Sequence, residues 1–222
     1  MDKDTLQNIL DDHALWLETG GLKGGRADLS GADLSGSDLS GADLRGADLY
    51  GAGLRGADMC RADLTGADLR AADLRGVDLA KANLTGADLY DANLAGANLS
   101  GAELQWADLY ASNLYDTNLA GANLLMADLR WVNLAKANLT GANLYRVSLA
   151  EANLAKANLS LADLRGADLT DANLTRVNLS EANLTGADLT GANLYRVSLA
   201  EANLTDANLT GANMTDEDGV QK

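Results

Sequence analysis

A five-residue phrase, Ala-Asp/Asn-Leu-x-x, repeats from residue 27 to residue 215 without an insertion or a deletion. Its central residue recurs at every fifth position from Leu29 to Met214, which gives 38 repeats, and all but Met59 and Met214 carry leucine there. This period suits neither a helix, in which five residues advance about 500°, nor a flat strand, whose side chains alternate with a period of two. The chain is therefore predicted to turn about once per repeat, so that every leucine points to one axis.

Four such turns close a square coil of 20 residues, so that residues 20 positions apart stack along the molecule. Short backbone segments of successive coils then pair as parallel β-bridges, with the leucine and the alanine two positions before it facing inward. Each repeat buries its apolar side chains only by stacking on its neighbours, which is the defining property of a solenoid. The sequence thus predicts an all-β solenoid of about 9.5 coils, roughly 45 Å long at ~4.8 Å per coil.

The repeats, such as GADLRGADLY at residues 41–50, resemble those of the pentapeptide-repeat proteins, a family with bacterial and cyanobacterial members. The resemblance covers the whole array and implies a right-handed quadrilateral parallel β-helix over residues 22–215. One branch of the family resembles duplex DNA in width and charge and binds type II DNA topoisomerases. The dimeric members meet through their C-terminal ends, which suggests a homodimer of that kind here.

The two ends of the chain lie outside the array and differ from each other. Residues 1–21 are expected to form a short N-terminal helical cap, with a helix over residues 4–17 that starts at Asp2 or Asp4 and covers the first coil. Residues 216–222 form a polar C-terminal tail that is too short to cap the last coil well. Leu6, Ile9, Leu10, His13 and Leu17 fall on one face of the predicted helix.

The residue before each central leucine is predicted to point outward, and on one face it is aspartate in nearly every coil. Two interpretations of this acidic stripe remain open. Each carboxylate accepts a neighbouring backbone N–H, or the stripe gives a chain of net charge −15 an electrostatic surface for a partner. On two other faces this position becomes asparagine, and the stacked amides are predicted to bond to one another. The acidic stripe consists of Asp28, Asp48, Asp68, Asp88, Asp108, Asp128, Asp168 and Asp188.

Large side chains gather at outward positions in the middle of the predicted rod. Exposed apolar clusters often mark partner sites, and Trp and Tyr dominate many interfaces. We interpret this group as a protein-binding patch; the alternative is that the side chains only shield the ladder or stack on each other. A corner row of Lys136, Lys156, Arg176 and Arg196 is interpreted as local charge balance, because it is short for nucleic acid. The patch consists of Trp106, Leu125, Met126, Trp131, Tyr145, Tyr90 and Tyr110.

The sequence contains no constellation for catalysis, a metal or a cofactor. The only histidine, His13, lies in the predicted cap, and no serine or threonine has a base at a meaningful spacing. The only cysteine, Cys60, excludes an internal disulfide and offers no metal cluster. No run of about 18 apolar residues predicts a membrane span, and no secretory signal is recognisable. These features favour a non-enzymatic protein of the cytoplasm.

Two functions from different classes remain open. The first is a structural scaffold whose flat faces bind an unidentified protein, without direct contact to nucleic acid. The second follows from the resemblance and is a DNA mimic that binds DNA gyrase. Against it, the chain has no phenylalanine at its central positions and no projecting loop within the array. Ice or mineral binding by threonine rows is a weaker third hypothesis, because those rows are short.

Overall fold

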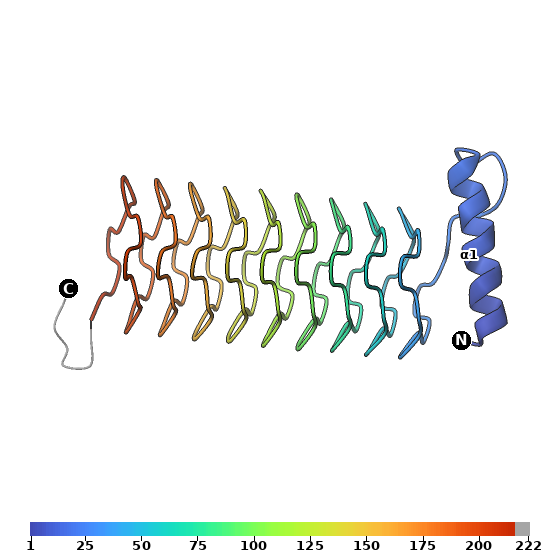
Figure 1. Ribbon diagram of the computed structural model, residues 1–222, viewed down its shortest axis with the longest axis horizontal. Coiled ribbons are helices and arrows are strands. Elements are labelled where there is room, and N and C mark those ends of the chain that lie inside the picture. The colour runs from blue at the N-terminus through green and yellow to red at the C-terminus, as the bar shows by residue number, and fades with distance from the viewer. Residues whose placement is uncertain (216–222) are drawn as a thin grey trace.

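The computed structural model describes residues 1–215 and has the form of a straight rod with one helix, α1 (Lys3–Glu18), at its N-terminal end (Figure 1). Isolated parallel β-bridges join each outward residue to the residue 20 positions later, from Asp28↔Asp48 to Asn193↔Asn213. Within residues 1–215 no extended strand forms, because each side of a coil contributes a single bridged residue before the chain turns. The fold is the predicted right-handed quadrilateral β-helix, and no loop interrupts its register.

Each repeat ends in a turn closed by its own backbone. The carbonyl of the central leucine accepts the N–H three residues later, as between Leu29 and Ala32 at 3.1 Å. The second residue after the leucine has a positive φ, +61° at Gly31, whereas the residue before it does not. This is the geometry of a type II turn, whose third position favours glycine. Many corners nevertheless hold other residues at φ between 52° and 64°, each at a cost of roughly 1 kcal/mol relative to glycine.

The residue before each leucine has a specific task in the backbone. Three N–H groups of a repeat donate to neighbouring coils and one closes the turn, which leaves the N–H of the residue after the leucine. That group donates to the side-chain oxygen two positions earlier, as from Tyr50 to Asp48 at 3.0 Å. Because a buried or crowded N–H without an acceptor is costly, this hydrogen bond explains why the position is aspartate or asparagine in all repeats but those of Gly53, Glu103, Ser148 and Ser198. The first interpretation of the aspartates is therefore confirmed.

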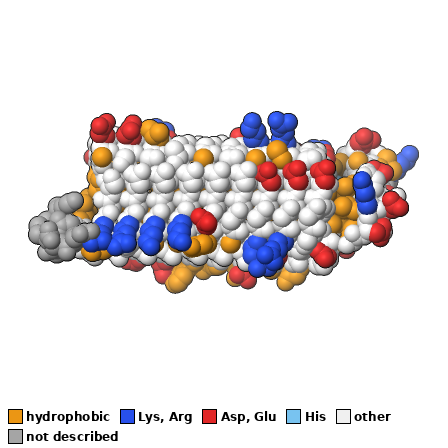
Figure 2. Space-filling view, turned by 60° about the horizontal axis from the view of Figure 1, so that its bottom comes forward, with side chains coloured by type: hydrophobic (Ala, Val, Ile, Leu, Met, Phe, Trp, Pro, Cys, Tyr) orange, Lys and Arg blue, Asp and Glu red, His pale blue; other side chains and the backbone are white. Residues whose placement is uncertain are grey.

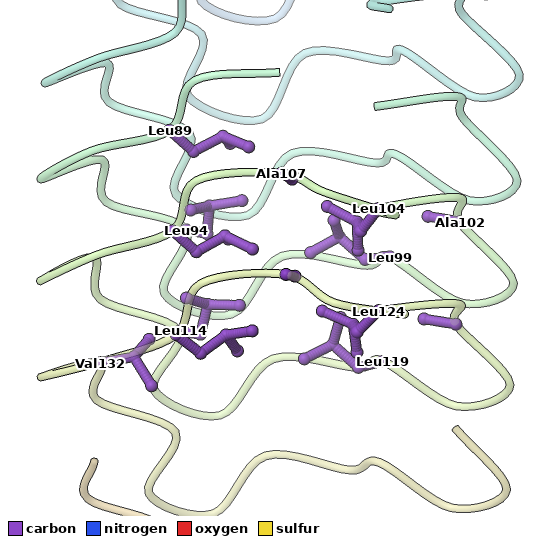
Figure 3. Close-up of a cluster of buried hydrophobic side chains, with 14 of the residues drawn as sticks. Leu89, Leu94, Leu99, Ala102, Leu104, Ala107, Leu114, Leu119, Leu124 and Val132 are labelled. Atoms are coloured by element: carbon purple, nitrogen blue, oxygen red, sulfur yellow. The ribbon is translucent and has the colours of Figure 1, made fainter. Parts of the chain in front are cut away.

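The interior is filled by the central leucines and the residues two positions before them. In Figure 3 leucines such as Leu94 and Leu104 project into the interior from opposite sides of the coil, and both are fully buried. Each buried leucine contributes on the order of 2 kcal/mol. Three inward positions hold polar residues, and all three hydroxyls donate to backbone carbonyls: Ser37 to Leu34, Ser112 to Leu109 at 2.6 Å and Thr117 to Leu94 at 3.1 Å.

Helix α1 closes the N-terminal end of the rod. Asp2 is its N-cap and accepts the backbone N–H of Thr5 at 2.9 Å. Leu6 and His13 are buried against the first coil, and Ile9 and Leu10 pack beside them. The Nδ1 atom of His13 accepts the N–H of Ala27 at 3.1 Å, and its ring stacks on Trp16 with centroids 5.6 Å apart. His13 therefore supplies an acceptor to the first residue of the array.

The C-terminal end differs. Leu194 is still 2% exposed, but the last coil is only partly buried within the described residues. The predicted polar tail, residues 216–222, lies outside those residues. The partly buried apolar residues of the last coil are Val197, Leu199, Ala202, Leu204, Ala207, Leu209, Ala212 and Met214.

Candidate interaction surface

The acidic stripe occupies one side of the rod, which we call the aspartate face. Bridges connect its residues coil by coil from Asp28 to Asp128, Ser148 interrupts the column, and Asp168 and Asp188 continue it. The residue two positions after each stripe position forms a second column on the same face. That second column reads Ser30, Tyr50, Arg70, Tyr90, Tyr110, Arg130, Ala150, Thr170, Thr190 and Thr210.

Arginines of the second column offset part of the stripe's charge. The Arg70 guanidinium lies 2.6 Å from the carboxylate of Asp68 and 3.5 Å from that of Asp88. Arg130 pairs with Asp128 at 2.6 Å. These hydrogen-bonded guanidinium groups hold the pKa of the Asp68 and Asp128 carboxyls below the usual value of 3.8. The stripe is thus ionised but partly neutralised in its middle.

Hydroxyl groups have the same effect on the pKa nearer the two ends of the stripe. The Ser30 hydroxyl donates to Asp28 at 2.6 Å, and the Thr190 hydroxyl donates to Asp188 at 2.5 Å. Both hydrogen bonds favour the carboxylate form and lower the pKa of the two acids. Part of the acidic stripe is therefore held ionised without a cation beside it.

Aromatic rings of the second column stack along the rod. The Arg70 guanidinium lies over the ring of Tyr50 at 5.5 Å, and Arg130 lies over Tyr110 at 5.3 Å. The rings of Tyr90 and Tyr110 stack with centroids 5.7 Å apart and planes within 5°. Of the predicted patch, Tyr90 and Tyr110 therefore stack on each other, as the alternative interpretation proposed. They leave Tyr90 47% exposed.

Three large residues project from the corners that bound the aspartate face. Trp106 and Met126 follow one another on one edge, and Trp131 lies on the other edge. They are 60%, 49% and 55% exposed. All three have a positive φ, between 54° and 60°. Large apolar side chains are thus held at exposed positions where glycine would be less strained.

The structure places five of the seven predicted patch residues on or at the edges of the aspartate face. Trp106, Met126 and Trp131 border the part of the acidic stripe that contains Asp108 and Asp128, and Tyr90 and Tyr110 lie between them. These five residues and the central part of the acidic stripe therefore form one surface, whereas the sequence predicted two separate sites.

Leu125 and Tyr145 do not share this face. They lie around the corner from Met126 and are half-buried. The Tyr145 ring has a guanidinium on either side, Arg146 at 5.3 Å and Arg165 at 5.4 Å. Their aromatic and aliphatic surface is therefore largely engaged within the chain.

Residues 1–215 contain no group of three or more His, Cys, Asp and Glu side chains positioned to hold a metal ion. Over the same residues, no helix is both long and apolar enough to cross a membrane. The carboxylates are spread along columns that face solvent.

The family model for pentapeptide repeats matches residues 27–66, 62–101, 78–114, 112–149, 142–180 and 178–216. The chain is a pentapeptide-repeat protein. Among solved structures it is similar to HetL, a pentapeptide repeat protein involved in heterocyst differentiation regulation from the cyanobacterium Nostoc. Their sequences are 33% identical over 94% of this chain and 97% of HetL, with a TM-score of 0.53.

The rod is also similar in fold to QnrB1, a plasmid-mediated fluoroquinolone resistance protein. The match covers 84% of this chain and 91% of QnrB1, with a TM-score of 0.67 and 20% identity. At that identity the likeness concerns the fold alone. No curated protein matches this pentapeptide-repeat protein by sequence.

Proposed function

We propose that this pentapeptide-repeat protein is a non-enzymatic scaffold that binds a protein partner through the aspartate face between Trp106 and Trp131. The observation that carries the proposal is the placement of two exposed tryptophans at corners with positive φ. Such side chains add strain and expose apolar area without filling the core, so folding does not require them. Strained, exposed residues of this kind are typical of functional positions.

The chemistry of the face supports a protein partner. Trp and Tyr are enriched in interface hot spots because they bury large, rigid surfaces. Asp108 lies between these aromatic residues, and cationic side chains of a partner would meet both the carboxylate and the ring faces. HetL, which resembles this chain over nearly its whole length, is involved in regulation. We place this protein in the cytoplasm as part of the same proposal, since its single thiol forms no internal disulfide.

The test removes the tryptophans without damaging the rod. Trp106→Gly and Trp131→Gly should leave the melting temperature unchanged or raise stability by up to about 1 kcal/mol, because the strain at positive φ is relieved. Both variants should lose a partner that wild-type protein retains in a quantitative pull-down. Leu161→Gly is the matched control, because Leu161 is 57% exposed at a corner on another side. Equal retention by all variants would disprove the role of this face.

A second candidate is binding to DNA gyrase, which the acidic stripe favours. Asp88 and Asp108 would then contribute the charge that duplex DNA otherwise presents. Asp88→Asn with Asp108→Asn should weaken inhibition in a gyrase supercoiling assay and reduce its salt dependence, while folding is unaffected because asparagine accepts the same N–H. Inhibition that survives these changes, or an absence of inhibition by wild-type protein, would remove this candidate.

A homodimer through the C-terminal end belongs to the same set of proposals. The partly buried leucines of the last coil support it, since stacking of a second coil on Leu204 and Leu209 would cover them. Leu209→Lys should then reduce the sedimentation coefficient. An unchanged coefficient would contradict this mode of association.

A further inference from the structure

We propose that two copies of the chain associate side by side and antiparallel through a third side of the rod, the amide face. This face is defined by the stacked column of Asn98, Asn118, Asn138, Asn158 and Asn178. The inference is independent of the proposed partner and of contact between C-terminal ends.

The centre of the amide face is flat and ordered. The Asn118 amide donates to the Asn98 side-chain oxygen at 3.1 Å, and Asn138 donates to Asn118 at 3.2 Å. The neighbouring column carries only small side chains in this part of the rod, so another flat surface can approach closely. That column reads Ser100, Ala120, Thr140, Ser160 and Ser180.

The positive and negative charges of this face lie mainly along its two edges, and each edge carries different charges in the N-terminal and C-terminal halves of the rod. On one edge, four glycines of the N-terminal half are followed by Asp116 and then by the basic row, as Figure 2 shows for a line of Lys and Arg side chains in the C-terminal half. The other edge has basic residues in the N-terminal half and acids in the C-terminal half. The charged residues are Asp38, Asp58, Asp78, Asp116, Glu181 and Glu201, against Arg61, Lys81, Lys136, Lys156, Arg176 and Arg196.

Six acids and six bases make this face neutral, although the chain carries a net charge of −15. Among the described residues, several cations of this face are not paired with an acid of their own chain. Within residues 1–215, no ion pair joins Lys81, Lys156 or Arg176 to a carboxylate. Neighbouring cations of the row are separated by one coil, ~4.8 Å, and repel each other by about 1 kcal/mol in water. An opposing surface with acids at the same spacing would relieve this repulsion.

A second copy, turned end for end, supplies that surface. We place the two-fold axis between the coils of Asp116 and Lys136, so that the corner of each residue lies opposite the corner of the other in the second copy. The Lys136 amine also donates to the Tyr115 hydroxyl of its own chain, so this pair contributes less than those of Lys81 and Arg61. Coil order then brings Lys81 opposite Glu181 and Arg61 opposite Glu201. It also brings Arg176 opposite Gly76, beside Asp78, and Arg196 opposite Gly56, beside Asp58.

The same arrangement matches shape as well as charge. Corner side chains project from the face at their positive φ, and those of Lys156 and Leu161 face Gly96 and Gly101 of the second copy. Leu161, which is 57% exposed, gains cover where the opposite corner has no side chain. A parallel pair about an axis along the rod would also bring Arg176 opposite Glu181 and Arg196 opposite Glu201. It would, however, leave Lys136 opposite Gly141 and Asp116 opposite Gly121, and it would bring Lys156 against Leu161. The pattern therefore favours the antiparallel pair.

The size of the face predicts the strength of the contact. Nine coils give a length of roughly 45 Å, and three extended residues give a width of roughly 10 Å. The area buried by the two copies together would be roughly 900 Å², below the ~1,200–2,000 Å² of stable interfaces and in the range of weak, transient ones. Association is therefore expected to depend on the charge pairs and to weaken as salt is added.

Sedimentation equilibrium of the full chain at low and high salt tests the proposal. Lys81→Glu puts acids opposite each other twice in the dimer, and Glu181→Lys puts bases there; either change should raise the dissociation constant about tenfold or more. The double variant Lys81→Glu with Glu181→Lys should restore wild-type association, because the pair is re-formed with reversed polarity. Arg55→Glu, which makes the same charge change on another side, is the control.

A wild-type protein that stays monomeric at low salt would overturn the proposal. So would a dimer that Lys81→Glu leaves intact, since it would use another surface such as the last coil. Failure of the double variant to restore association would also count against the stated pairing. The variants are expected to fold like the wild-type protein, because Lys81 and Glu181 are both exposed corner residues.

The thiol of Cys60 reports the orientation. In the antiparallel pair Cys60 faces Ala200 of the second copy, so Ala200→Cys should give a covalent dimer under mild oxidation, whereas wild-type protein should give none. Covalent dimer from wild-type protein would place two copies of Cys60 together, which the antiparallel pair keeps far apart, and would contradict the proposal.

Discussion

The two ends of the rod differ in how well their apolar side chains are covered. At the N-terminal end, α1 covers the first coil and the residues Leu34 and Leu39 are 3% and 2% exposed. At the C-terminal end the equivalent leucines of the last coil are only partly buried within the described residues. A solenoid needs a cover because its coils expose apolar side chains and unpaired backbone groups at each end. We therefore expect the local free energy of unfolding to be lower in the last coil than in the first.

Leucine truncations in the two end coils should give the largest difference. Leu39→Ala leaves a cavity under a covered coil and should destabilise by about 2–5 kcal/mol. Leu204→Ala removes a side chain that is already partly exposed, so its cost should be clearly smaller, roughly 1 kcal/mol. Urea unfolding of both variants measures the contrast. Equal costs would mean that the last coil is as well covered as the first.

Breaking the docking of α1 should make the N-terminal end resemble the C-terminal end. Gly24 has φ +72°, and a Cβ atom there would lie 2.2 Å from the Asp12 carbonyl oxygen and 2.7 Å from the Trp16 nitrogen. Because both atoms are backbone, Gly24→Ala should displace α1 and expose the first coil. Hydrogen exchange should accelerate in residues 28–47. Gly46→Ala, where a Cβ meets no atom within 4 Å, is the control for the strain of positive φ alone.

Lowering the pH should also weaken the packing of α1 on the first coil, with a smaller effect than Gly24→Ala. Burial lowers the pKa of His13 below its ordinary value of 6.5; Asp43 acts in the opposite direction, and Arg26 and Arg45 support the lowering. Since Nδ1 accepts the Ala27 N–H, a proton added there would break that bond. The stabilising contribution is therefore complete above pH 6.5 and declines as the pH falls toward the lowered pKa.

Hydrogen exchange of the first coil between pH 8 and pH 5, corrected for the intrinsic rate, measures this decline. His13→Gln keeps an acceptor and removes the titration, so its protection should be independent of pH. An identical pH profile in both proteins would exclude His13 as the cause.

Much of this architecture could be predicted from the sequence because the period never breaks. A constant repeat gives every residue a coil and a column, so the inward leucines, the stacked asparagines and the acidic stripe follow from counting. The helix is one residue longer at each end than predicted. The Asn113 amide donates to Asn93 at 3.1 Å, as expected for a ladder.

Other features depend on side-chain conformations that the period does not determine. The hydrogen bond from Ala27 to His13 could not be predicted, because it depends on the path that the chain takes between α1 and the first repeat. The hydroxyls of Ser112 and Thr117 are tolerated inside only because carbonyls lie within reach. The ion pair of Arg70 with both Asp68 and Asp88 depends on a rotamer, and so does the contact of Lys136 with the Tyr115 ring at 4.9 Å.

The backbone N–H that each aspartate or asparagine accepts has a consequence for the chemistry of the whole surface. What that N–H requires is an oxygen atom, and a carboxylate and an amide provide it equally well, at 3.1 Å for both Asp88 and Asn143. Electric charge at these positions is therefore uncoupled from folding. A rod of this kind can change from anionic to neutral along its length, or acquire a new pattern by single substitutions, while its skeleton stays the same.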